Sequence, residues 1–302
     1  KTLLLFNFSF LIFTCTQAQA LRQRQQLTHA DSLRGTYGPS RDWWNVLKYD
    51  LHVKFNIQDS TISGYNEMSF KILNTSLNIP NGNHGIAEKL MQIDLQEPMI
   101  LDGISILSKS PLKSNSQTQA EIKYTAKEVK FTKEGNAYFF DWSKENLKKG
   151  EIYTIKIYFH GKPTIARRPP WDGGLIWKKS ADGSPWVSIA CQGLGASVWY
   201  PNKDHQSDEP DSAEMHITVP DSLMCVGNGR YRGKINNGDG TATYDWAVTE
   251  PINNYNIIPY IGKYVTWHED YMGEKGKLDC DFWVMDYNLE KAKQQFAQVA
   301  PM

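Results

Sequence analysis

The stretch from Ser188 to Pro220 reads SIACQGLGASVWYPNKDHQSDEPDSAEMHITVP and is the most informative segment of this 302-residue chain. It places Gln192 beside a cysteine at the end of an apolar run, and it ends in an alternating segment, Met215–Val219. Alternation of apolar and polar residues is typical of a strand with one buried face. The stretch therefore predicts an irregular loop between two β-strands.

Alternating strands of this kind recur along most of the chain. Apolar residues occupy every second position from Tyr49 to Ile57, and Met68–Ile72 repeats the pattern after Ser63-Gly64, which indicates a bulge or bend. Successive strands without helices between them predict a mainly β fold, a large antiparallel β-sandwich. Further strands are predicted at Ile104–Leu107, Glu121–Tyr124, Glu128–Phe131, Ala137–Asp141, Ile152–His160, Trp186–Ala190, Arg230–Ile235 and Thr241–Val248, with a hairpin turn at Asn236–Gly240.

The final segment of the chain has a different pattern. Residues 278–284 alternate as a strand, Asn288 is a typical helix N-cap, and apolar residues follow at helical spacing from Leu289 to Val299. We therefore expect an incomplete second domain to begin at residue 268. The predicted organisation is a signal peptide at 1–20, a polar lead-in at 21–40, a β domain at 41–267 and the start of another domain at 268–302.

The N-terminus has the pattern of an export signal. Lys1 precedes an apolar run from Leu3 to Phe13, and Ala18-Gln19-Ala20 is a typical cleavage site. We expect cleavage after Ala20 and a periplasmic or secreted product, with lipidation at Cys15 as a minor alternative. The run is shorter than the ~20 residues that span a bilayer. Because 33 basic residues balance 33 acidic ones, the composition also gives no reason to expect a nucleic-acid partner.

The cysteines favour buried thiols. Cys15 lies in the predicted signal, so Cys191, Cys225 and Cys280 remain, and no CxxC or Cys/His cluster has zinc spacing. Buried thiols act as small apolar side chains. A Cys191–Cys225 disulfide is the alternative, because exported proteins meet oxidising conditions.

Complete catalytic motifs are missing from the sequence. His268-Glu269 is not followed by the second histidine of HExxH, so a surface turn is the favoured interpretation. No GxSxG nucleophile motif is present. Gly193-Leu194-Gly195 lacks the third glycine of a dinucleotide-binding loop, which favours a tight irregular loop. We therefore predict no catalytic residue and no metal ligand in this chain.

Two compositional features leave alternatives open. The acidic residues after Pro201 form either a solvated loop, which is favoured, or a site for a cation or a basic partner domain. The ten tryptophans either fill the core and interfaces, which is favoured, or serve a self-standing exported carbohydrate- or peptide-binding module. The acidic residues are Asp204, Asp208, Glu209 and Asp211.

Several of these motifs together resemble the N-terminal, non-catalytic domain of the aminopeptidase N family of zinc metallopeptidases, which includes the leukotriene-A hydrolases. The resemblance covers about residues 41–302, although the segment from Pro201 to Asp208 is longer than in the family. The matching segments are Cys191-Gln192, Pro201, Asp208-Glu209-Pro210, Glu214–Pro220, the hairpin from Tyr49 to Ile72, Leu223–Gly229, Glu250-Pro251, Ile257–Lys263, and Lys277–Ala292 as the start of the catalytic domain.

The resemblance implies a saddle-shaped antiparallel β-sandwich, followed by the first strand and helix of a thermolysin-like α/β domain, truncated before the GxMEN and HExxH motifs. It implies that Gln192 binds the free amino end of a peptide substrate, because an amide oxygen accepts a hydrogen bond from an ammonium. Zinc is then held by the catalytic domain of the full-length enzyme and not by this chain. The chain alone is expected to be inactive, with the catalytic domain and the peptide N-terminus as its partners.

Overall fold

The computed structural model describes residues 26–75, 89–110 and 123–302, so the predicted export signal and Cys15 lie outside the described residues. Two compact units are present, residues 1–36 and 37–302. The described part of the first unit contains helix α2 (His29–Gly35). Thr28 caps this helix, since its hydroxyl accepts from the Asp31 amide and the Asp31 carboxylate accepts from the Thr28 amide.

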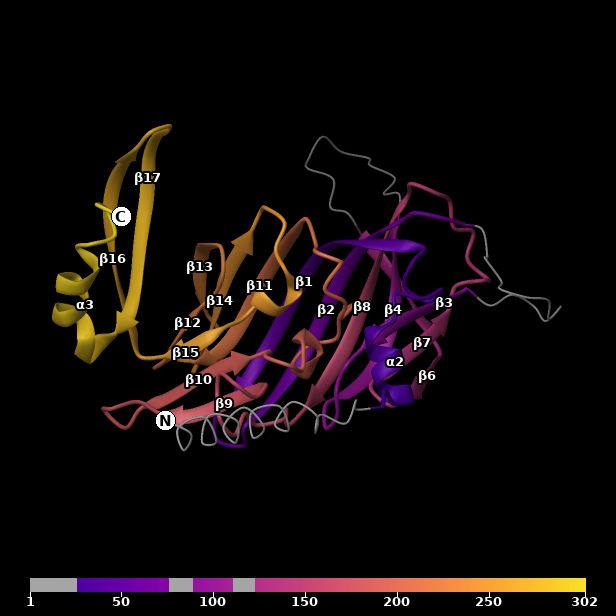
Figure 1. The fold of residues 1–302 in the computed structure, drawn as a ribbon, viewed down its shortest axis with the longest axis horizontal. Coiled ribbons are helices and arrows are strands. Elements are labelled where there is room, and N and C mark those ends of the chain that lie inside the picture. Colours follow the sequence, from indigo (N-terminus) through magenta and orange to yellow (C-terminus); the bar gives the residue numbers. More distant parts are fainter. Residues whose placement is uncertain (1–25, 76–88, 111–122) are drawn as a thin grey trace, which may run out of the picture. The chain divides into compact units, whose positions relative to one another are not determined.

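An eight-stranded sheet dominates the second unit. Its strands are β1 (Trp44–Asn56), β2 (Thr61–Ile72), β4 (Ile100–Ser110), β5 (Lys123–Val129), β8 (Ile152–Gly161), β11 (Ser212–Pro220), β13 (Arg230–Asn236) and β14 (Thr241–Val248). They are ordered β13–β14–β11–β1–β2–β8–β4–β5, and Figure 1 shows the central ones side by side. The predicted mainly β fold is confirmed. One detail differs, because β1 and β11 are parallel and the sheet is therefore not purely antiparallel.

Three smaller sheets accompany the large one. The four-stranded sheet contains β9 (Gly174–Lys179), β10 (Pro185–Ala190), β12 (Met224–Val226) and β15 (Tyr260–Gly262). The three-stranded sheet contains β3 (Leu90–Asp94), β6 (Phe131–Glu134) and β7 (Ala137–Asp141). The third is a hairpin of β16 (Tyr264–Gly273) and β17 (Gly276–Met285).

Helix α3 (Leu289–Phe296) follows the β16–β17 hairpin, as the N-cap pattern at Asn288 predicts. His268 and Glu269 lie inside β16, so their assignment to a surface turn is wrong. The predicted domain boundary after residue 267 also falls within this strand. Among the described helices, none has both the length and the apolar character needed to cross a membrane.

The core lies on one face of the eight-stranded sheet. Along β1, Tyr49, Leu51 and Val53 are buried, as the alternation predicts. Val187 of the four-stranded sheet and Ile93 of the three-stranded sheet belong to the same apolar cluster, so both smaller sheets pack on this face. Each such side chain contributes about 1.5–3 kcal/mol when it leaves water.

The tryptophans mainly serve this core. Trp44, Trp142 and Trp199 are fully buried. Of the ten tryptophans, all within described residues, Trp171 alone is highly exposed, at 83%. The structure therefore favours the core role over an aromatic carbohydrate-binding surface.

Gly64 marks a close approach between strands rather than the bulge that the sequence indicates. It lies within continuous β2 and pairs with Val53 on β1. A Cβ atom at this position would lie 1.9 Å from the carbonyl oxygen of His52, so only glycine fits. The register shift between β1 and β2 falls instead between Val46 and Lys48.

The three cysteines of the described part are free thiols, so the proposed Cys191–Cys225 disulfide is not formed. Cys191 and Cys225 are buried, as predicted, whereas Cys280 on β17 is only partly buried. Burial raises the pKa of Cys191 to about 12, and it raises the pKa of Cys225 as well.

Thiol labelling at pH 8 is expected to modify Cys280 in the native chain and to spare Cys191 and Cys225. The buried thiols stay protonated because their pKa values lie above this pH, and the thiolate is the reactive form. Mass spectrometry after labelling with and without denaturant measures the difference. Native labelling of Cys191 at the rate of Cys280 contradicts the prediction.

Candidate functional site

Gln192 lies in a tight turn directly after β10. The side chain of Gln192 is exposed, whereas Cys191 before it is buried. The turn is closed by the amides of Leu194 and Gly195, which donate to the Cys191 carbonyl oxygen at 3.1 and 2.8 Å. Gly195 has a φ of 81°, a left-handed conformation that favours glycine. The buried Cys191 thus fixes the start of the turn, and Gln192 is held at the surface.

The segment before β9 packs against the same turn. A Cβ atom at Gly173 would lie 2.7 Å from the Gln192 carbonyl oxygen and 2.8 Å from the Leu194 Cγ atom. Just before Gly173, the Asp172 carboxylate accepts from the amides of Arg167 and Arg168 at 2.8 and 2.5 Å. This compact loop therefore lies beside the Gln192 turn in space, although β9 and β10 separate the two in sequence.

Gln96, which the sequence does not single out, also holds the Gln192 turn. Its Nε2 atom donates to the Leu194 carbonyl at 2.5 Å and to the Ser197 hydroxyl at 2.8 Å. Its backbone amide also donates to the Ser197 carbonyl at 2.9 Å. Because Gln96 is far from the turn in sequence, no local motif reveals this contact.

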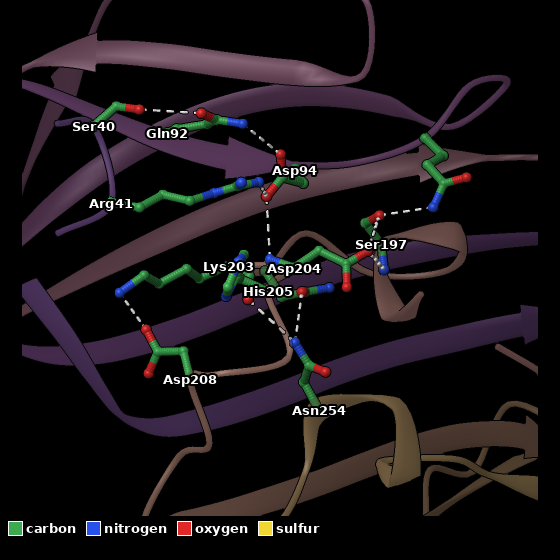
Figure 2. A network of polar contacts seen from close by, with 12 residues as sticks. Ser40, Arg41, Gln92, Asp94, Ser197, Lys203, Asp204, His205, Asp208 and Asn254 are labelled. Carbon is green, nitrogen blue, oxygen red and sulfur yellow. Dashed lines mark hydrogen bonds and ion pairs between the residues drawn. The ribbon is translucent and has the colours of Figure 1, made fainter. Parts of the chain in front are cut away.

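A buried polar network continues from the turn into the protein (Figure 2). Asp204 accepts from the amide and hydroxyl of Ser197 at 3.2 and 2.5 Å. The Asp204 amide in turn donates to the Asp94 carboxylate at 3.1 Å, and Asp94 is paired with Arg41 and accepts from Gln92 at 2.9 Å. Burial raises the pKa of Asp94, and Arg41 opposes that effect. Charged groups in the interior therefore fix the backbone that supports Gln192.

Lys203 and Asp208 form a second buried ion pair beside this network (Figure 2). The Lys203 ammonium also donates to the Trp44 carbonyl at 2.7 Å and to the Tyr37 hydroxyl at 3.0 Å. The Asn254 side chain donates to the Lys203 carbonyl at 3.1 Å. The Trp44 and Tyr37 oxygens compensate the buried Lys203 ammonium for lost hydration, and the Asp208 carboxylate supplies its countercharge.

The predicted solvated acidic loop is therefore wrong for two of its four residues. Asp208 is buried against Lys203, and Asp204 is half-buried against Ser197. Glu209 and Asp211 are exposed, as expected. Asp204 and Asp208 thus stabilise the loop through contacts inside the protein.

The Gln192 turn offers an exposed amide on a rigid support. The structure shows no hydrogen bond from the Gln192 side chain to any residue within 26–75, 89–110 or 123–302. The two groups of potential metal ligands in these same residues lie elsewhere, at Asp50, His52 and His216 and on the β16–β17 hairpin. The turn is therefore suited to bind a polar ligand and does not itself fit a catalytic zinc ion.

No protein-family model matches the chain, and no curated protein is significantly similar to it in sequence. Among solved structures it is similar to a mutant M1 zinc metallopeptidase from Deinococcus radiodurans bound to a Tyr-Ser-Ala substrate, with a TM-score of 0.60 and 16% identity over 84% of this chain and 50% of that one. A two-domain M1 zinc metallopeptidase mutant bound to L-tryptophan gives a TM-score of 0.59 and 15% identity over the same shares.

Native leukotriene A4 hydrolase from Saccharomyces cerevisiae is similar as well, with a TM-score of 0.58 and 17% identity over 91% of this chain and 37% of that one. The chain spans about half the length of the metallopeptidase structures that it matches. The predicted resemblance is thus confirmed in fold, over the part of these proteins that the chain covers.

Proposed function

We propose that this chain is the N-terminal, non-catalytic β domain of an exported zinc aminopeptidase of the M1 type. The likeness in fold supports the family. The observation that carries the role of the site is Gln192, an exposed amide on a turn whose backbone is held by Gln96 and Asp204. Export rests on the signal pattern that ends at Ala20.

The proposed task of the domain is to wall the substrate cleft and to bind the amino end of a peptide. The Gln192 amide oxygen accepts a hydrogen bond from the substrate ammonium, a charge-assisted contact worth about 1.5–3 kcal/mol. The sequence has no HExxH motif, so the zinc ligands of the M1 type are not supplied by this chain. When bound, such an ion polarises the peptide carbonyl and activates a water molecule.

Replacing Gln192 by alanine in the full-length enzyme is expected to lower kcat/KM for aminoacyl anilides by about 10–100-fold, the rate equivalent of one charge-assisted hydrogen bond. Gln192→Glu should keep the acceptor and most of the activity. Gln58→Ala is the matched control, because Gln58 is exposed in the turn between β1 and β2.

Two further outcomes bear on this proposal. The chain by itself should release no N-terminal residue from peptides. An unchanged kcat/KM in Gln192→Ala would show that the turn does not contact the substrate. Metal-dependent peptidase activity of the isolated chain would contradict the non-catalytic role.

The alternative is a self-standing exported module that binds carbohydrate or peptide, and Trp171 is the one observation in its favour. An exposed indole is suited to stack on a sugar ring. Glycan binding that is lost in Trp171→Ala and kept in Gln192→Ala would support this module over the aminopeptidase domain.

A further inference from the structure

Two acidic residues and two histidines lie together on the face of the eight-stranded sheet opposite the core. Asp50 and His52 are separated by one residue on β1, as are Glu214 and His216 on β11. Because β1 and β11 run parallel in register, Asp50 lies beside Glu214 and His52 beside His216. Side chains two residues apart on a strand share a face, so all four gather in one half-buried patch.

The Asp50 carboxylate stands between the two imidazoles. Its Oδ1 atom lies 3.0 Å from the His52 Nε2 atom and 3.3 Å from the His216 Nε2 atom. One ligand atom from each of the three residues lies within 4.8 Å of the others. Asp50 Oδ1 is buried and, apart from its ion-pair contacts with the two imidazoles, has no hydrogen-bond partner among the described residues. A carboxylate oxygen in this position is available to a cation.

Asp245 on β14 orients one of the histidines. It pairs with His216 across the strands, and its Oδ1 atom lies 2.6 Å from the His216 Nδ1 atom. This contact leaves the Nε2 atom directed toward Asp50. A carboxylate on the outer nitrogen is the usual support of a metal-bound histidine.

We propose that Asp50, His52 and His216 form a binding site for a Zn²⁺ ion, with water completing its coordination. Two imidazole nitrogens and a carboxylate oxygen are a common ligand set for this metal. This proposal revises the expectation that the chain binds no metal, which considered only ligands with motif spacing in the sequence. It does not depend on the proposed aminopeptidase function.

Binding requires a local movement of one ring. The two imidazoles are stacked, with centroids 4.2 Å apart and planes at 16°, so one ion cannot lie in both planes. The one polar contact of the His52 ring is with Asp50, which is itself a proposed ligand, so the ring can turn about its Cβ–Cγ bond without leaving another polar group of the described residues unpaired. It then loses its stacking on Tyr65, where the centroids are 4.4 Å apart. This rearrangement is confined to a side chain of the sheet surface.

The lysine beside the patch contacts only one oxygen of the Asp50 carboxylate. Lys48 lies 3.1 Å from Asp50 Oδ2 and 3.0 Å from Glu214 Oε2, which leaves Asp50 Oδ1 for the ion.

Titration of the full chain with ZnCl₂, in a Cys280→Ser background that removes the one thiol of the described residues that is not buried, is expected to show one high-affinity equivalent. His52→Asn and His216→Asn should each weaken binding by at least about 10–100-fold, the range reported for loss of a supporting residue. Asp245→Asn keeps all three ligands and should weaken binding within that range. X-ray absorption of the wild-type complex should show two imidazole ligands.

The control is His268→Asn, because His268, Asp270 and Asp279 form an exposed group of potential ligands on the hairpin. This variant should bind Zn²⁺ like the parent chain, and circular dichroism checks that every variant is folded. Absence of a stoichiometric equivalent would overturn the proposal. Unchanged Zn²⁺ binding in His52→Asn and His216→Asn would also overturn it. If either variant fails to fold, the X-ray absorption spectrum of the wild-type complex decides, and a spectrum without two imidazole ligands overturns the proposal.

Discussion

Replacing Lys203 by methionine is expected to lower the free energy of unfolding by about 3–5 kcal/mol. The Lys203 side chain is fully buried, and its ammonium contacts the equally buried Asp208 carboxylate. Burial lowers the pKa of Lys203, while Asp208 raises it, so the charge depends on this partner. Methionine fills a similar volume but leaves Asp208 without a countercharge in the interior. Urea unfolding followed by tryptophan fluorescence measures the loss.

Two comparison variants separate charge burial from ordinary surface effects. Lys127→Met removes a pair with Glu145 in which the lysine side chain is 63% exposed, and it should change stability by at most about 1 kcal/mol. The double variant Lys203→Met/Asp208→Leu should recover part of the loss, because both buried charges disappear together. A loss in Lys203→Met no larger than in Lys127→Met contradicts the argument.

Strands with one buried and one exposed face could be predicted from the sequence. The strand predicted at Ala137–Asp141 is confirmed by β7, and β13 and β14 begin at the predicted residues. In the four-stranded sheet, alternation predicts β10 alone, and the segments of β12 and β15 are indicated only by the resemblance, since β15 has only three residues; β9 was missed because its first half is buried without alternation. A pattern of period two cannot reveal such strands.

The supports of the candidate site could not be predicted, because they join distant segments. Gln192 stands in a recognisable motif, but Gln96 and Asp94 contact its loop from a segment that is distant in sequence. The pairing of His52 with His216 likewise follows from a parallel register. Parallel strands need long crossover connections, so their register cannot be read from a turn.

Replacing Arg41 by methionine is expected to destabilise the protein by about 3–5 kcal/mol and, in addition, to loosen the Gln192 turn. Arg41 neutralises Asp94 in the interior, and Asp94 holds the Asp204 amide. The Asp204 carboxylate accepts hydrogen bonds from the amide and hydroxyl of Ser197, which follows the Gln192 turn. Without Arg41, Asp94 is a buried charge that lacks its main partner, and burial favours its protonated form. Protonation or displacement of Asp94 weakens each later contact in this series.

Hydrogen exchange distinguishes this local effect from general destabilisation. Ile155→Ala is the matched variant, since Ile155 is fully buried on β8 and its truncation costs about 2–5 kcal/mol. At equal unfolding free energy, the amides of Leu194 and Gly195, which bond to the Cys191 carbonyl, should exchange faster in Arg41→Met. Equal protection in both variants would mean that Asp94 stabilises only the core and that the position of Gln192 is set by Gln96 and the packing of Gly173.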